Sequence, residues 1–141
     1  MEDGAKSNRT AMTQTIVTSH AAEQRERLES MLRTVPVETR RAEPMARHTS
    51  LKVGGPADVM VFPRQPETLC EILRSAKTAK APVFFLGGGT NLLVKDGGIG
   101  GLVIKLSRFN QIVEDSERIY VEAGVPCPRL IRFSLEKVSR V

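Results

Sequence analysis

The segment of the sequence best suited to chemistry is a run of three glycines, Gly87-Gly88-Gly89, followed by Thr90 and Asn91. The run comes directly after an apolar stretch that favours a short strand. Glycines at the end of a strand leave the main chain accessible, and consecutive N–H groups in such a turn can bind an anion. The Thr90 hydroxyl and the Asn91 amide add further hydrogen-bond donors. The pattern predicts a phosphate-binding loop.

Two common classes of glycine-rich phosphate loop are excluded by the spacing. The glycines do not follow G-x-G-x-x-G, and no G-x-x-x-x-G-K-[ST] sequence is present. They lead into Leu92-Leu93-Val94 and further glycines instead of a helix. The loop is therefore expected to hold phosphates by main-chain amides between strands, without a helix N-terminus behind it. A flexible turn is the alternative interpretation of the same glycines.

Periodicity and prolines predict the elements that position this loop. Residues 57–62 alternate loosely and stop at Pro63, which favours a strand. A helix is expected to begin at Pro66. Residues 83–86 are expected to form a short buried strand that completes a β-α-β unit. The predicted buried face of the helix is Leu69, Ile72, Leu73 and Ala76, and a buried, reduced Cys70 is expected in the same helix.

Further elements are predicted on both sides of this unit. After the glycines we expect a strand at 102–106, a hairpin from 111–114 and 118–122, and a helix at 129–137. Upstream, residues 21–34 read as a short amphipathic helix ended by Pro36. These elements imply three regions: a disordered tail (1–19), the helix with a linker (20–48), and the main domain (49–141).

Composition excludes several function classes. The net charge of +5 is spread thinly, and no basic patch is interleaved with aromatic residues, which argues against nucleic-acid binding. Cys70 and Cys127 lack metal-ligand spacing, so no metal site is expected, and the lone cysteines favour a reducing, cytoplasmic setting. No apolar run is long enough to cross a membrane.

Three blocks of the sequence resemble one family. Residues 49–58, Thr-Ser-Leu-Lys-Val-Gly-Gly-Pro-Ala-Asp, are similar to the opening signature of UDP-N-acetylenolpyruvoylglucosamine reductases, the UDP-N-acetylmuramate dehydrogenases of peptidoglycan synthesis. Residues 86–106 resemble the pyrophosphate loop of that family and the strand after it. Residues 121–125 resemble the next block. The three blocks occur in order, within a match over about residues 30–137.

The resemblance implies an α+β fold, the FAD-binding domain of the p-cresol methylhydroxylase (PCMH) or vanillyl-alcohol-oxidase type. It has two small α/β subdomains, of which the second would be truncated here. It also implies FAD as cofactor, bound by Gly87, Gly88, Gly89, Thr90, Asn91 and Leu92, with Gly54 and Gly124 as further cofactor-binding residues. Such a protein works in the cytoplasm on cell-wall synthesis, and therefore on cell shape and division.

The reaction implied by the resemblance is a reduction. In the family, NADPH reduces FAD, and the reduced flavin reduces the enolpyruvyl double bond of a nucleotide-sugar substrate, UDP-N-acetylglucosamine enolpyruvate. A serine, a glutamate and an arginine assist. The match to the family pattern ends after residues 135–137, so those three residues are expected beyond Val141 and no catalytic residue is assigned. The sequence leaves oligomeric state open.

Three other interpretations remain open on the sequence. The chain could bind FAD or another nucleotide without catalysing a reaction. It could belong to a different PCMH-type flavin oxidoreductase, because the fold serves unrelated oxidases. The mildly basic composition leaves a small nucleic-acid-binding protein as the interpretation from another class.

Overall fold

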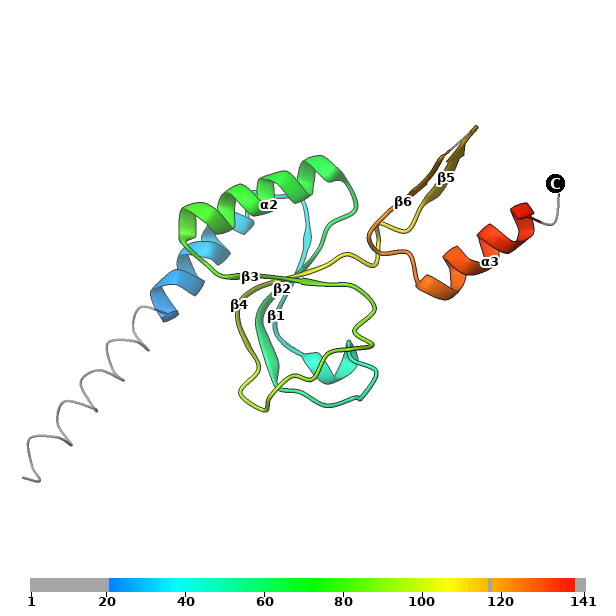
Figure 1. Ribbon diagram of the computed structural model, residues 1–141. Coiled ribbons are helices and arrows are strands. Elements are labelled where there is room, and N and C mark those ends of the chain that lie inside the picture. Colours follow the sequence, from blue (N-terminus) through cyan, green and yellow to red (C-terminus); the bar gives the residue numbers. More distant parts are fainter. Residues whose placement is uncertain (1–20, 117, 139–141) are drawn as a thin grey trace, which may run out of the picture.

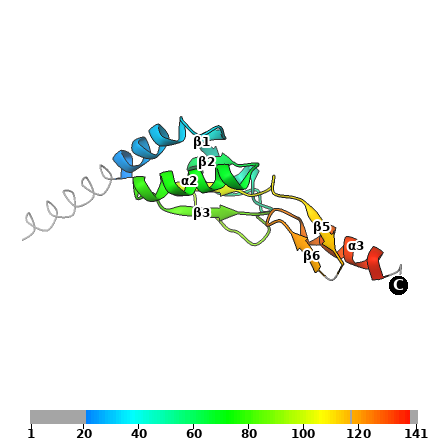
Figure 2. The same cartoon turned by 90° about the horizontal axis from the view of Figure 1, so that it is seen from above.

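The computed structural model describes residues 21–116 and 118–138. These residues form a four-stranded sheet with helices on one face, and a separate two-stranded hairpin followed by a helix (Figure 1). Figures 1 and 2 both place the hairpin and the last helix at one end of the molecule. The predicted disordered tail at 1–19 lies outside the described residues.

Strand order in the larger sheet is β1-β2-β4-β3. Its strands are β1 (Glu38–Pro44), β2 (Pro56–Phe62), β3 (Val83–Leu86) and β4 (Ile99–Lys105). Strand β1 pairs antiparallel with β2, while β2 and β3 both run parallel to β4. The chain crosses from β2 to β3 through helix α2 (Pro66–Ala79), so the predicted β-α-β unit is confirmed, with β4 inserted between its two strands.

Helices cover one face of the sheet and form the first core. The helical residues 21–32 and helix α2 pack there against alternate residues of β2 and β4. Periodicity explains the contact, because residues three or four apart lie on one side of a helix and alternate residues lie on one side of a strand. The buried members are Leu28, Leu32, Val35, Val59, Val61, Ile72, Ala76, Ala79, Leu102 and Ile104.

Loops cover the opposite face and form the second core. One loop includes the short 3-10 helix η1 (Met45–Arg47) and leads to β2; the other joins β3 to β4. Their apolar residues pack on the strand residues that point away from the helices. The buried members are Met45, Ala57, Met60, Phe62, Leu86, Val94 and Val103.

The hairpin and last helix match their predicted positions. Strands β5 (Ile112–Asp115) and β6 (Arg118–Val121) pair antiparallel, and helix α3 is Cys127–Val138. Several of their apolar side chains remain exposed, including Val113 at 53% and Ile131 at 59%. Among the described residues, no helix has both the length and the apolar composition needed to span a membrane.

Three predictions about individual elements are wrong. Residues 36–48 are not a linker, because most of them form the edge strand β1 and η1. Strand β3 is not buried: it lies at the other edge of the sheet, and Phe85 is 51% exposed. Cys70 is also exposed, because it lies outside the helical stripe that packs on the sheet.

Candidate functional site

The glycine loop and the segment 45–55 pack against each other on the loop-covered face of the sheet. The Ser50 N–H donates to the Gly89 carbonyl at 3.0 Å, and the Gly55 N–H donates to the Lys95 carbonyl at 3.0 Å. The Thr49 hydroxyl is buried and donates to the Val53 carbonyl at 3.0 Å. The first two bonds hold the segment 45–55 to the loop between β3 and β4, and the third braces the segment 45–55 itself.

The three glycines have different surroundings. A Cβ atom added at Gly87 would meet no other atom within 4 Å, and one at Gly88 would meet only Thr90 Cγ2, at 3.8 Å. At Gly89 the added atom would lie 2.0 Å from the His48 carbonyl oxygen, and φ is +71°. Gly89 is therefore required by packing and backbone conformation. Gly87 and Gly88 leave open space on their exposed side.

The main-chain amides of this loop are available to a ligand. Within the described residues, the N–H groups of Gly88, Gly89, Thr90 and Asn91 donate no turn or loop hydrogen bond. No helix follows before β4, as expected from the spacing. Gly88, Thr90 and Asn91 are exposed to solvent. Consecutive N–H groups without an acceptor in the protein can bind an anion such as a phosphate.

Lys105, the last residue of β4, lies beneath the loop and was missed by the sequence analysis. Its Nζ donates to the Gly87 carbonyl at 2.6 Å, and the residue is only 9% exposed. Burial lowers the pKa of Lys105 from its ordinary value of 10.5. The signal was a single cation inside the apolar stretch 102–106, since charged residues are rarely buried without a specific partner.

Leu92, Gly54 and Gly124 were also predicted to contact the cofactor, and packing accounts for their residue types. The Leu92 side chain packs against the second core. A Cβ added at Gly54 would lie 2.7 Å from Val94 Cβ, and one at Gly124 would lie 2.0 Å from the Leu106 carbonyl oxygen. Their contacts with a cofactor, if made through the main chain, remain predictions.

Gly124 is nevertheless joined to the same edge of the sheet. Its N–H donates to the Phe109 carbonyl at 2.8 Å, and the Leu106 N–H donates to the Leu86 carbonyl at 2.9 Å. Leu86 directly precedes the glycine loop. The two regions therefore meet at the carboxyl ends of the parallel strands β3 and β4, the edge at which open α/β sheets usually bind ligands.

A charged cluster fixes the segment that underlies Gly89. Glu43 is 6% exposed; its carboxylate lies 2.9 Å from His48 Nε2 and accepts from Arg40 at 3.2 Å. Burial disfavours the charged carboxylate, but the hydrogen bonds from His48 and Arg40 outweigh this effect and lower the pKa of Glu43. The His48 main chain, packed under Gly89, is thus tied to β1.

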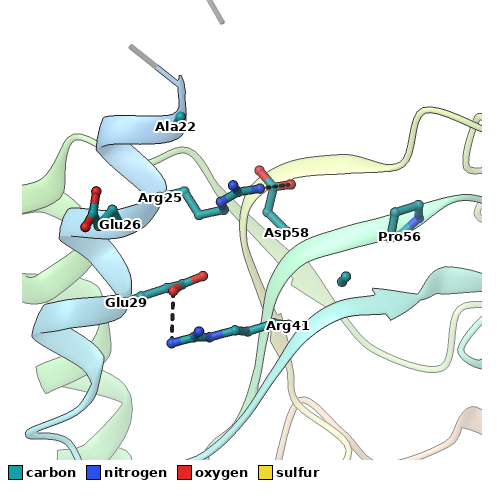
Figure 3. A pocket seen from close by; sticks show the side chains of 8 residues that line it. Ala22, Arg25, Glu26, Glu29, Arg41, Pro56 and Asp58 are labelled. Carbon is teal, nitrogen blue, oxygen red and sulfur yellow. Dashed lines mark ion pairs between the residues drawn. The ribbon is translucent and has the colours of Figure 1, made fainter. Parts of the chain in front are cut away.

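The cavity drawn in Figure 3 lies away from this site. It has a volume of about 520 Å³ and opens between the helical residues 21–32 and strands β1 and β2. Arg41 pairs with Glu29 at 3.0 Å, and Arg25 lies 3.9 Å from Asp58. Because these charges are already paired and the lining contains no predicted site residue, the cavity is not assigned a ligand.

A family model described as "FAD binding domain" matches residues 57–137. The chain belongs to the FAD-binding domain family. Its α+β fold and FAD as the cofactor are thereby confirmed, and the relatives described next confirm the resemblance seen in the sequence.

Two relatives carry the name of one enzyme. The UDP-N-acetylenolpyruvoylglucosamine reductase of Caldanaerobacter subterraneus subsp. tengcongensis is 46% identical over 93 residues, which are 66% of this chain and 31% of the relative. The crystal structure of the Thermus caldophilus enzyme of that name has a TM-score of 0.52 and 30% identity, covering 72% of this chain and 34% of that one. This FAD-binding domain thus spans about a third of the length of these relatives.

A more distant structure shares the fold alone. A variant of berberine bridge enzyme matches with a TM-score of 0.59 at 17% identity, covering 79% of this chain and 26% of that one. The PCMH-type architecture is therefore shared well beyond the reductases.

The residues of the loop fit the diphosphate of FAD. Gly87 and Gly88 leave space beside the main chain, the N–H groups from Gly88 to Asn91 have no main-chain acceptor, and Lys105 Nζ donates to the Gly87 carbonyl. Amide donors, open space and positive charge each favour binding of a dinucleotide's diphosphate.

Proposed function

We propose that this FAD-binding domain serves an NADPH-dependent reductase that converts UDP-N-acetylglucosamine enolpyruvate to UDP-N-acetylmuramate in the cytoplasm. The observation that carries the proposal is the 46% identity over 93 residues with a reductase named for this substrate. The two free cysteines suit a reducing compartment. The proposed activity belongs to the peptidoglycan pathway and so to cell shape and division.

In this proposal the chain's own residues bind and orient the cofactor. Amides of Gly88, Gly89, Thr90 and Asn91 donate to the diphosphate, and Gly87 leaves the space for it. Gly54 and Gly124 flank the loop and contact the cofactor through their main chains, as does Leu92. When bound, FAD supplies the two-electron redox chemistry that side chains cannot.

Cofactor uptake tests the first part of the proposal. Purified protein is expected to take up FAD and show flavin absorbance, and the double substitution Gly87→Val and Gly88→Val is expected to abolish uptake by filling the open side of the loop. Gly97→Val is the matched control, because a Cβ there would also meet no atom within 4 Å but the residue lies outside the glycine run. Uptake that survives the double substitution contradicts the assignment of this loop.

A second candidate is that the 141-residue chain binds FAD and catalyses nothing alone. Coverage of about a third of each relative favours it, because in those enzymes a chain about twice as long as this one carries the activity. NADPH oxidation in the presence of UDP-N-acetylglucosamine enolpyruvate separates the two candidates. We expect none from residues 1–141 alone; substrate-dependent oxidation would favour the first candidate for this chain itself.

A further inference from the structure

We propose that Lys105 is the positioning residue of the glycine loop. Its amine fixes the orientation of the Gly87–Gly88 peptide, and its positive charge, beneath that peptide, attracts the diphosphate bound above it. The inference rests on the proposed assignment of FAD to this loop. It adds a residue that neither the glycine pattern nor the match to the FAD-binding domain identifies.

Two hydrogen bonds set the direction of the peptide groups in the glycine loop. In a trans peptide the C=O and the following N–H point in opposite directions, and no cis peptide occurs among the described residues. Because Lys105 Nζ holds the Gly87 carbonyl at 2.6 Å, the Gly88 N–H must point away from the lysine. The Ser50 N–H holds the Gly89 carbonyl in the same manner and turns the Thr90 N–H away from Ser50.

Lys105 carries a largely buried charge. The residue is 9% exposed and donates to a neutral carbonyl, and no carboxylate pairs with it in the described part of the chain. Buried cations are normally neutralised by an anion. Burial lowers the pKa of this amine, which an anion in the loop would oppose. A diphosphate over Gly87 and Gly88 would be the missing counter-charge.

The test compares three substitutions of Lys105 in the 141-residue chain. Met removes the donor and the charge, Gln keeps a donor without the charge, and Arg keeps both. Lys77→Met is the matched control, since Lys77 is exposed on α2 and its loss changes the net charge equally. The readouts are FAD affinity, and shifts of the Gly88 and Thr90 amide resonances on titration with inorganic diphosphate.

We expect Lys105→Met to weaken diphosphate and FAD binding about tenfold, because the variant loses a positive charge that acts on the diphosphate across the Gly87–Gly88 peptide and also loses the bond that orients this peptide. Lys105→Gln should recover folding stability but not affinity, and Lys105→Arg should recover most of the affinity. If Gln restored both, Lys105 would be a structural donor only, and its role as counter-charge would be wrong. Wild-type affinity in the Met variant would overturn the whole inference.

The proposed function fails separately from this inference. A wild-type chain that binds neither FAD nor diphosphate contradicts the cofactor assignment itself and the counter-charge with it. If the wild type binds and every Lys105 variant binds equally well, only the role of Lys105 is contradicted. One measurement needs no variant: the Gly87 carbonyl carbon shift of the wild type should follow deprotonation of the Lys105 amine. A carbonyl shift that ignores this titration would show that the two groups are not bonded.

Discussion

Gly88 and Gly89 are adjacent residues with different tasks, and substitution by alanine should separate them. An alanine at Gly89 needs a left-handed φ of +71° and places Cβ 2.0 Å from the His48 carbonyl oxygen. We expect it to lower the free energy of unfolding by about 2 kcal/mol or more. Urea denaturation measures the loss.

Gly88→Ala is the companion substitution. Its Cβ would meet nothing closer than Thr90 Cγ2 at 3.8 Å, so unfolding should change by less than about 0.5 kcal/mol. Binding of FAD should weaken, because the methyl group enters the open side of the loop. If Gly89→Ala were as stable as Gly88→Ala, the close contact between Gly89 and the His48 carbonyl would be contradicted.

Because the folded state lowers the pKa of Glu43, the free energy of unfolding should fall in acid. Hydrogen bonds from His48 and Arg40 lower its pKa despite the opposing effect of burial, so its contribution is present at pH values above its ordinary pKa of 4.5. It is lost as the pH falls from there through the lower pKa of the folded state. Glu43→Gln should cost about 2 kcal/mol at neutral pH, and the difference from wild type should shrink in acid.

Thermal unfolding at several pH values checks this prediction. Glu71→Gln is the control: Glu71 is exposed on α2, and its substitution should leave the acid dependence of the wild type intact. A Glu43→Gln deficit that stays constant into strong acid would mean that the carboxylate is not the stabilising form.

At the scale of elements, helix α2 shows how far periodicity reaches. The stripe Leu69, Ile72, Leu73 and Ala76 was predicted and does pack on the sheet. Ile72 is fully buried, and Ile72→Ala should cost about 2–4 kcal/mol through lost packing and a residual cavity. Cys70→Ala in the same helix should change stability by less than about 0.5 kcal/mol, because Cys70 is exposed. Equal losses of stability in the two variants would contradict the orientation of helix α2 on the sheet.

Strand β1 shows where sequence reasoning failed. Its residues are almost all polar, and only Glu43 of Glu38–Pro44 is buried, so no apolar alternation marks the strand. An edge strand exposed on most of its side chains forms through main-chain pairing with β2, which leaves no hydrophobic pattern in the sequence. The opposite edge, β3, is an apolar sequence that looks buried, because the pattern cannot tell a central strand from an edge.

The same limit applies to the candidate site. The glycine loop was predicted because glycines and their spacing are local properties of the sequence. Lys105 was missed because it lies 18 residues from Gly87 in the sequence, and only the pairing of β3 with β4 brings the two residues together. The difference between Gly88 and Gly89 likewise depends on His48, which lies 41 residues upstream of Gly89 and which no local pattern could connect with it.

At the scale of the whole molecule, the described residues divide into a well-packed sheet and an outlying hairpin with helix α3 (Figures 1 and 2). The buried core belongs almost entirely to the first part. The second part exposes apolar side chains, among them Val113 at 53%, Tyr120 at 53% and Ile131 at 59%. Exposed apolar surface of this kind favours association between molecules.

We therefore expect the 141-residue chain to self-associate as its concentration rises, and the double substitution Val113→Lys and Ile131→Lys to reduce this association without loss of stability. Light scattering and sedimentation measure association, and urea denaturation measures stability. The control, Gln65→Lys with Gln111→Lys, adds the same charge at exposed polar positions. Because it leaves the apolar surface intact, it should associate nearly as the wild type does. If the control suppressed association equally, net charge and not the hairpin and α3 surface would govern the behaviour of the chain.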